Sequence, residues 1–238
     1  MSTSTASVPT MSSLAMRLSR LAPLKATESE ALRVAERDQR RSPARRELVA
    51  EGERVRDARA LLSGWACRQR VLADGRRQIL SFLLPGDLMG MCPQANPLAS
   101  TTILAITEVM TCAVPAAEPG SALSEAYARS AALEEYHLLA QITRLGRLNA
   151  YERLADWLLE TQERLALVGL STRDQFPLPL TQEMLADALG LTSVHVNRTL
   201  QALRRDGLLT SRGGMISLPD RNRLAKLVGY KAACVSSD

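Results

Sequence analysis

The spacing of apolar side chains changes twice along the chain and divides it into three stretches. Residues 27–119 carry short runs of alternating apolar and polar residues, broken by turn residues, which is typical of half-buried strands. Residues 121–148 lack proline and repeat apolar residues every three or four positions, as an amphipathic helix does. Residues 149–238 hold shorter helical repeats separated by glycine and proline. This order predicts an α+β fold with a β-rich first half.

The first stretch predicts a small antiparallel barrel or jelly roll behind one helix. Asp74-Gly75 lies between two alternating runs, which is a strong hairpin signal, and Gly86-Asp87 marks another turn. Several short strands at close spacing favour a closed antiparallel arrangement. Ahead of them, ATESEALRVAERD predicts a helix with Thr27 as N-cap and Glu30 completing a capping box.

The helix predicted over residues 121–148 would be about 40 Å long. A domain of this size does not cover such a helix, so an apolar stripe along it calls for a partner helix, and we expect a dimer seam. The alternative is a long helix packed wholly on its own chain. The row begins at Leu123 and Ala126, and the predicted seam residues are Leu133, Tyr136, Ala140, Thr143 and Leu148.

Residues 181–205 have the spacing of a helix-turn-helix. Thr181 is placed to cap a helix that ends before Gly190, a residue suited to a left-handed turn, and Thr192 to cap the next helix. Helices joined by so short a turn cross steeply, and the small Ala186 allows their contact, with Val196 on the facing apolar side. An ordinary helical hairpin is the alternative. The segment before, STRDQFPLP, is predicted as a connector after a helix ending at Gly169; Gly213-Gly214 indicates a hairpin and Asp220 a last helix start.

The second helix of the pair has an open polar side at its start, which suits the major groove of DNA. Arg198 is expected to pair with guanine, Asn197 with adenine, and His195 to donate to a base or phosphate. The start of the first helix and an arginine on the hairpin would meet phosphates. The predicted DNA-binding residues are Thr181, Gln182, Thr192, Ser193, Val194, His195, Asn197, Arg198 and Arg212.

Composition and charge set bounds on these expectations. The 238 residues are 46% hydrophobic but 3% aromatic, so the core is expected to be aliphatic. No apolar run reaches the roughly 20 residues of a membrane span, and no secretory signal pattern opens the chain. Lys and Arg compare with Asp and Glu as 16 to 12 in residues 1–120, 5 to 7 in 121–170 and 9 to 6 in 171–238. Basic ends fit contact with nucleic acid, and an ordinary solvated surface gives similar numbers. The four cysteines form no C-x-x-C pair, which predicts a cytoplasmic protein without disulfides.

Nearly the whole chain resembles the CRP/FNR superfamily of bacterial transcription regulators. The resemblance is carried by Glu51-Gly52, LLSGWACR and DGRRQILSFLLPGDLMG, by the long helix, and by LTQEMLADALGLTSVHVNRTLQALRRDGLL; the wording is most similar to the FNR-type and FixK-type branches. The family implies a homodimer on a palindrome in double-stranded DNA, with RNA polymerase as a further partner. The implied domains are a tail and lead-in helix (1–24), a cyclic-nucleotide-binding-like sensor β-roll (25–120), a dimerisation helix (121–148) and a winged helix-turn-helix (149–238).

Departures from the family pattern bear on the signal and the half-site. Gly90-Met91 and Ala99-Ser100-Thr101 replace the Gly-Glu and Arg-Ser-Ala of cyclic-nucleotide binders, so cyclic AMP is not an expected ligand. No cysteine precedes Cys67, so an iron–sulfur cluster would require the fold to group Cys67, Cys92 and Cys112. Val194-His195 stands where many relatives have a glutamate; Val194 cannot accept from cytosine but can touch a thymine methyl.

The remaining special residues have two interpretations each. Cys92 is either an exposed redox thiol or an apolar filler like Cys67 and Cys112. His137 would suit a haem or a metal, but His195 is the other histidine, so a His-based site lacks partners and no cofactor is expected. No nucleophile motif or P-loop points to an enzyme. We expect a regulator whose roll responds to a ligand or redox signal by shifting the packing near Tyr136–Leu148 and the domain angle after Asn149; a signal-blind roll serving as scaffold or polymerase contact is the alternative.

Overall fold

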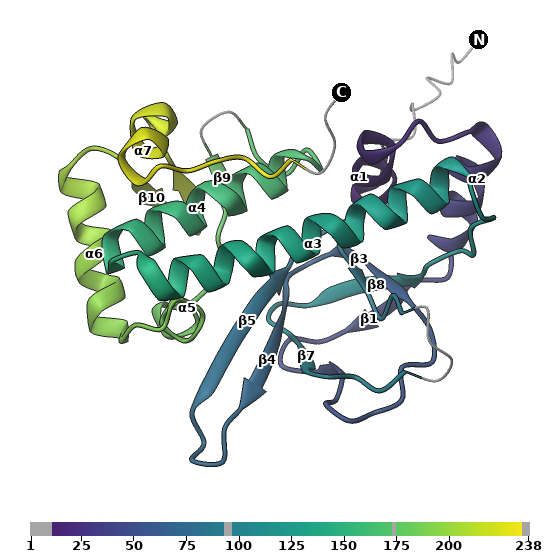
Figure 1. Cartoon of the computed structure of the whole chain (residues 1–238), viewed down its shortest axis with the longest axis horizontal. Helices are drawn as coiled ribbons and strands as arrows, with labels where there is room; N and C mark the ends of the chain where they lie inside the picture. Colours follow the sequence, from purple (N-terminus) through teal and green to yellow (C-terminus); the bar gives the residue numbers. More distant parts are fainter. Residues whose placement is uncertain (1–10, 93–96, 173–174, 235–238) are drawn as a thin grey trace, which may run out of the picture.

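The computed structural model describes residues 11–92, 97–172 and 175–234. A β-roll lies beside the first part of a long helix, and a helical domain lies at the far end of that helix (Figure 1). The arrangement is the α+β architecture that the three-stretch pattern predicts.

The roll consists of two four-stranded antiparallel sheets. One has the order β1-β8-β3-β6 and is built from β1 (Arg40–Ser42), β8 (Val109–Ala113), β3 (Arg59–Ser63) and β6 (Leu88–Met89). The other has the order β2-β7-β4-β5 and is built from β2 (Glu47–Val49), β7 (Thr102–Ala105), β4 (Ala66–Val71) and β5 (Arg77–Leu83). The hairpin predicted at Asp74-Gly75 joins β4 to β5, where Gly75 has a φ of 83° that favours glycine.

Two helices, α1 (Ser13–Leu21) and α2 (Ala26–Ala35), precede the roll. The predicted cap of α2 is wrong. Lys25, not Thr27, is the N-cap residue, and Glu28 accepts the Lys25 N–H at 2.7 Å while Glu30 pairs with Arg33. Glu28 also accepts the N–H of Leu123 at 2.9 Å. Glu28 thereby joins the start of α2 to the start of the long helix. Local spacing does not reveal this tertiary contact, which accompanies the start of α2 ahead of its predicted position.

The helical half begins with α3 (Ala122–Arg147) and α4 (Ala150–Ala166), separated by Leu148 and Asn149. The Asn149 side chain caps α4 by accepting the N–H groups of Tyr151 and Glu152. The elements that follow are α5 (Gln182–Leu189), α6 (Ser193–Arg205), α7 (Arg221–Val228), β9 (Gln175–Pro177), β10 (Thr210–Arg212) and β11 (Met215–Ser217). The predicted hairpin at Gly213-Gly214 connects β10 to β11, and β9 pairs with β11, so the predicted connector supplies a third strand. No helix in the described ranges is long and apolar enough to cross a membrane.

One hydrophobic cluster crosses from the roll into the helical domain. Trp65, Ile79 and Phe82 of the roll belong to the same cluster as Leu158 and Trp157 of α4. The rings of Phe82 and Trp157 lie 5.3 Å apart in an edge-to-face arrangement. The roll and the helical domain are therefore packed on each other and not merely tethered.

Candidate nucleic-acid interface

The helix-turn-helix predicted over residues 181–205 is formed by α5 and α6. The Thr181 hydroxyl accepts the Met184 N–H and the Thr192 hydroxyl accepts the His195 N–H, each at 3.2 Å. Gly190 adopts a left-handed conformation with φ 62° and ψ 40°. Both predicted caps and the predicted turn residue are confirmed.

The two helices bury a shared apolar face. Its members are Leu185, Ala186, Leu189, Val196, Leu200 and Leu203, each at most 6% exposed. All six belong to the cluster that continues into α4 and the roll. The orientation of α6 is therefore set by packing on its back face, which leaves its front free.

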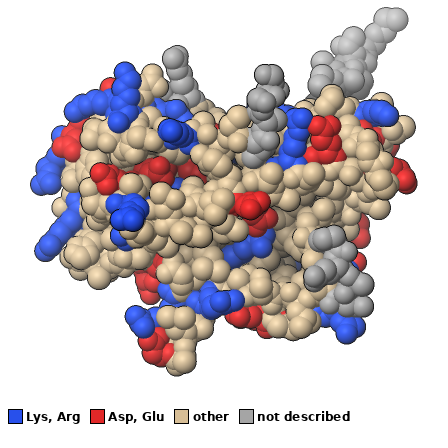
Figure 2. Space-filling view, viewed as in Figure 1, with Lys and Arg blue, Asp and Glu red and all other residues tan. Residues whose placement is uncertain are grey.

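The front of α6 carries most of the predicted contact residues. Ser193, Val194, His195 and Arg198 are exposed, Val194 at 56%. The remaining predicted positions, Thr181, Gln182, Thr192 and Arg212, are exposed as well, and Arg212 lies on β10. Basic side chains protrude at the end of the molecule where α6 lies (Figure 2). A polar, basic helix face with a strand hairpin beside it has the geometry of a winged major-groove reader.

Asn197 differs from its neighbours because its amide is already engaged. Its Nδ2 donates to Gln182 Oε1 at 3.1 Å, and its Oδ1 accepts from Gln201 Nε2 at 2.8 Å. The predicted pairing with adenine would therefore replace two side-chain hydrogen bonds. Gln201 was not predicted from the sequence as a partner of Asn197. The available signal was its position one helical turn after Asn197, on the same open side of α6.

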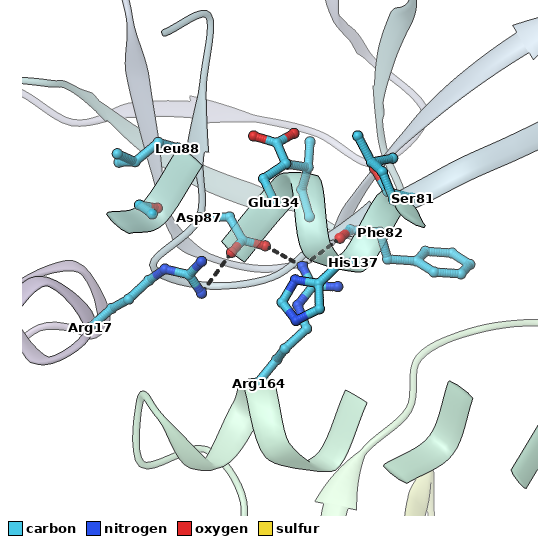
Figure 3. Close-up of a pocket in the computed structure, with 11 residues that line it drawn as sticks. Arg17, Ser81, Phe82, Asp87, Leu88, Glu134, His137 and Arg164 are labelled. Carbon is cyan, nitrogen blue, oxygen red and sulfur yellow. Dashed lines mark hydrogen bonds and ion pairs between the residues drawn. The ribbon is translucent and has the colours of Figure 1, made fainter. Parts of the chain in front are cut away.

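A buried polar cluster links the roll to α1 and α4 at the turn that contains Asp87 (Figure 3). Arg17 of α1 and Arg164 of α4 reach the Asp87 carboxylate at 2.9 and 2.7 Å, and the Leu84 N–H donates to it at 2.7 Å. Burial opposes the ionised form of Asp87, but the Arg164 and Arg17 guanidinium groups outweigh it and hold its pKa below the usual value. Charged side chains therefore connect the roll, α1 and α4 at this point.

The same chain of contacts continues along α4 to the end of α3. Arg144, 2% exposed, reaches Glu160 at 2.6 Å and Asp156 at 2.7 Å, and its Nη1 donates to Gln141 Oε1 at 2.5 Å. Burial works against the charge on Glu160, yet Arg144 holds the pKa of this carboxyl below its ordinary value. Gln141 then donates to the Ala188 carbonyl of α5 at 2.6 Å. Polar contacts therefore run from the roll to the helix-turn-helix.

His137 lies beside this cluster. Burial, assisted by the Arg164 charge, lowers the pKa of His137 to about 4. The imidazole is neutral at pH 7 and packs edge-to-face on Tyr136 with ring centroids 5.9 Å apart. Within the ranges the structure describes, no three His, Cys, Asp or Glu residues are grouped as a metal site.

The cysteines do not form the group that an iron–sulfur cluster would need. Cys67 and Cys112 are buried in different hydrophobic clusters, and burial raises the pKa of each thiol to about 11. Cys92 is exposed on a cleft that Arg56, Gly90 and Met91 also line. The grouping of Cys67, Cys92 and Cys112 that such a cluster would require is therefore not formed, because the roll places these residues in separate surroundings.

The long helix is formed as predicted, and its expected seam residues differ in exposure. Leu133 is 5% exposed and packs, with Leu123 and Ala126, in the cluster that α1 and the roll share. The exposed apolar face is instead made by Leu138, Leu139 and Ile142, exposed at 37, 57 and 67%. Of the other predicted seam residues, Tyr136 donates to the Lys231 carbonyl of its own chain, Ala140 and Leu148 are half-buried, and Thr143 is exposed.

Comparison with known proteins follows the same division of the chain. Residues 39–125 match the family model of the cyclic nucleotide-binding domain, and residues 152–227 match that of the Crp-like helix-turn-helix domain. The nitrogen fixation regulation protein FixK of Bradyrhizobium diazoefficiens is 37% identical over 177 residues, which cover 70% of this chain and 72% of that protein. The chain belongs to the CRP/FNR family. As a CRP/FNR protein of the FixK/FNR type, it is a DNA-binding transcription regulator.

Further relatives agree with this assignment. The transcriptional activator protein FnrL of Cereibacter sphaeroides is 31% identical over 70% of both chains. The structure of FixK2 from Bradyrhizobium japonicum matches with a TM-score of 0.68 at 29% identity, covering 82% of this chain and 98% of that one. A CRP-family transcriptional regulator from Thermus thermophilus matches with a TM-score of 0.63 at 27% identity, covering 80% and 96%. These relatives are transcription regulators and not enzymes.

Proposed function

We propose that this CRP/FNR regulator acts as a homodimer that reads a palindromic operator with α6. The observation that carries the proposal is the exposed start of α6, where Ser193, Val194 and Arg198 stand in front of a fully packed apolar back face. Arg198 would pair with guanine, and Val194 would touch a thymine methyl. Thr181, Gln182 and Arg212 would contact phosphates.

The partner subunit would pack on the exposed face of α3. Ile142 follows Leu139 by three residues and Leu138 by four, which places the three side chains on one side of α3. Thr143 would extend this stripe, with Tyr136, Ala140 and Leu148 at its margin. An uncovered apolar stripe of this kind on a long helix is what a paired helix would bury.

The roll would bias the orientation of the DNA-binding domain through the buried contacts between α3 and α4. The likeness to cyclic nucleotide-binding domains supports a sensing role, while Gly90-Met91 and Ala99-Ser100-Thr101 argue against cyclic AMP as the signal. We keep the division into a lead-in (1–24), a roll (25–120), a dimerisation helix (121–148) and a DNA-binding domain (149–238) as part of the proposal. Contact with RNA polymerase, a cytoplasmic location and a redox role for Cys92 stay predictions.

Selection of bound duplexes from a random DNA library under reducing conditions tests the proposal. The expected result is a two-fold symmetric site with half-sites about 34 Å apart, one turn of DNA. Enrichment of a single asymmetric half-site would contradict the dimer. No enrichment from the library, with or without thiol oxidation, would contradict sequence-specific reading.

A further inference from the structure

The C-terminal end of α5 is held by side chains from three other elements. Gln141 of α3 donates to the Ala188 carbonyl at 2.6 Å, and Gln78 of β5 approaches the same carbonyl at 3.5 Å. Arg153 of α4 donates to the Leu189 carbonyl at 3.0 Å. The last carbonyls of a helix lack partners within it, so these side chains satisfy groups that would otherwise be unpaired. The end of α5 is thereby fixed to both helices and to the roll.

An ion pair between the roll and α5 strengthens this attachment. Arg77 of β5 donates to Asp187 Oδ2 through Nε at 2.8 Å and through Nη2 at 2.5 Å. The two side chains are 26 and 24% exposed, so water screens the pair only in part. Charge-assisted bonds of this type are short and directional. Arg77 consequently specifies where α5 lies on the roll.

The position of α5 in turn decides the position of α6. The two helices are joined by a short turn through Gly190 and bury a common apolar face. A Cβ at Gly190 would meet Leu145 Cδ2 at 3.3 Å and Arg153 Nη1 at 3.5 Å, so the turn is also packed against the ends of α3 and α4. A shift of α5 on the roll would therefore move the DNA-facing side of α6.

From this geometry we infer that Arg77, acting through Asp187, is a positioning residue for DNA recognition, although it lies on β5 of the roll and not on the helix-turn-helix. The inference rests on the proposed function. Arg77 holds the helix-turn-helix in the orientation in which two subunits present their recognition helices to one operator. Without the ion pair, the DNA-binding domain samples other orientations and operator affinity falls.

General attraction between a basic side chain and DNA makes a different prediction, and two variants separate the effects. Arg77→Ala removes a positive charge, whereas Asp187→Asn removes a negative one. Simple electrostatics would weaken binding in the first variant and strengthen it in the second. Loss of positioning weakens both. The matched control is Arg76→Ala, since Arg76 neighbours Arg77 on the same hairpin and forms its ion pair with the exposed Asp74 at the hairpin tip.

The experiment measures affinity for the selected operator and for unrelated duplex, together with the thermal midpoint of each variant. Arg77→Ala and Asp187→Asn are each expected to bind the operator about three- to ten-fold more weakly, with unrelated duplex bound as by wild type. The exchanged pair, Arg77→Asp with Asp187→Arg, should recover operator affinity to within about two-fold because the pair is restored in reverse. Equal affinities in Arg77→Ala and Arg76→Ala, or tighter operator binding by Asp187→Asn, would overturn the inference.

Hydrogen exchange without DNA keeps the inference testable if no operator is found. Arg77→Ala and Asp187→Asn should speed amide exchange in residues 182–190 relative to wild type and Arg76→Ala. Wild-type exchange there in both variants would sink the positioning role even if the operator is real. Failure of wild type to select any sequence would count against the proposed function alone.

Discussion

Arg198 is the residue on which we expect sequence-specific reading chiefly to depend. It is exposed on the open side of α6 and has the donor geometry to bind guanine O6 and N7 together. Arg198→Ala is expected to cost about 1–3 kcal/mol of operator affinity, concentrated at one base position in each half-site. A panel of single-base operator variants measures this. Arg205→Ala, at the exposed end of α6, is the control and should weaken binding evenly; an even loss in Arg198→Ala would make Arg198 a phosphate contact.

His137 is expected to give the stability of the folded state a pH dependence. Because burial lowers its pKa to about 4, the folded protein binds fewer protons than the unfolded chain between pH 4 and the ordinary His value of about 6.5. The free energy of unfolding should therefore rise with pH across that window, by on the order of 3 kcal/mol, and reach its full value above it. Denaturant unfolding at pH 4.5 to 7.5 measures the slope.

The contribution of His137 is isolated by comparing two histidine variants. His137→Gln should flatten the rise in unfolding free energy between pH 4.5 and 6.5. His195→Gln, on the exposed side of α6, should keep the wild-type profile. Identical slopes in wild type and His137→Gln would assign the pH dependence to other groups.

At the scale of elements, we expect the exposed apolar face of α3 to form the dimer interface. Ile142 is 67% exposed and Leu139 57%, and a partner helix would cover both. Ile142→Glu should convert a dimer to a monomer, because a paired helix would have to bury the new carboxylate without a partner. Light scattering after size-exclusion chromatography measures the mass. The control is Leu227→Glu on α7, where Leu227 is 54% exposed, and this variant should remain dimeric. If Ile142→Glu is dimeric as well, this face of α3 does not form the dimer interface.

The elements also show what local sequence decides. Thr181, Gly190 and Thr192 were predicted correctly because caps and left-handed turns depend on neighbours within a few residues. The dimer seam stays a prediction, because α3 carries two apolar rows and spacing does not say which one the roll covers. Leu133 belongs to the covered row and Ile142 to the uncovered one. That choice follows from the placement of α1 and the roll.

At the scale of the molecule, Asp87 holds three elements together. It is 5% exposed, and its two arginine partners come from α1 and α4. Asp87→Asn would leave both guanidinium groups buried with weakened pairing, so we expect a loss of about 3–5 kcal/mol in unfolding free energy. Denaturant unfolding monitored by tryptophan fluorescence measures it. Asp74→Asn, at the exposed hairpin tip, should leave stability nearly unchanged, and an equally mild Asp87→Asn would refute the role of the cluster.

This polar cluster could not be predicted from sequence. Asp87 and Arg164 lie 77 residues apart, and neither sits in a motif that specifies an ionic partner. Their pairing, like that of Arg77 with Asp187, arises only when the roll docks on the helical half. Pattern analysis therefore predicted the roll, the long helix and the caps of the helix-turn-helix, while the contacts that couple the halves needed the folded chain. The DNA-contact residues stay predictions.

The cluster shared by Trp65, Phe82 and Trp157 limits how freely this architecture can be recombined. A gene fusion that joins the helical half to the roll of another protein would expose the surface around Trp157, because the roll residues that cover it would be missing. Such hybrids are expected to aggregate unless the counterparts of Phe82 and Trp157 are transplanted together, which the soluble yield of paired hybrids would reveal. In regulators of this type, the roll and the helical half would then be expected to be inherited together.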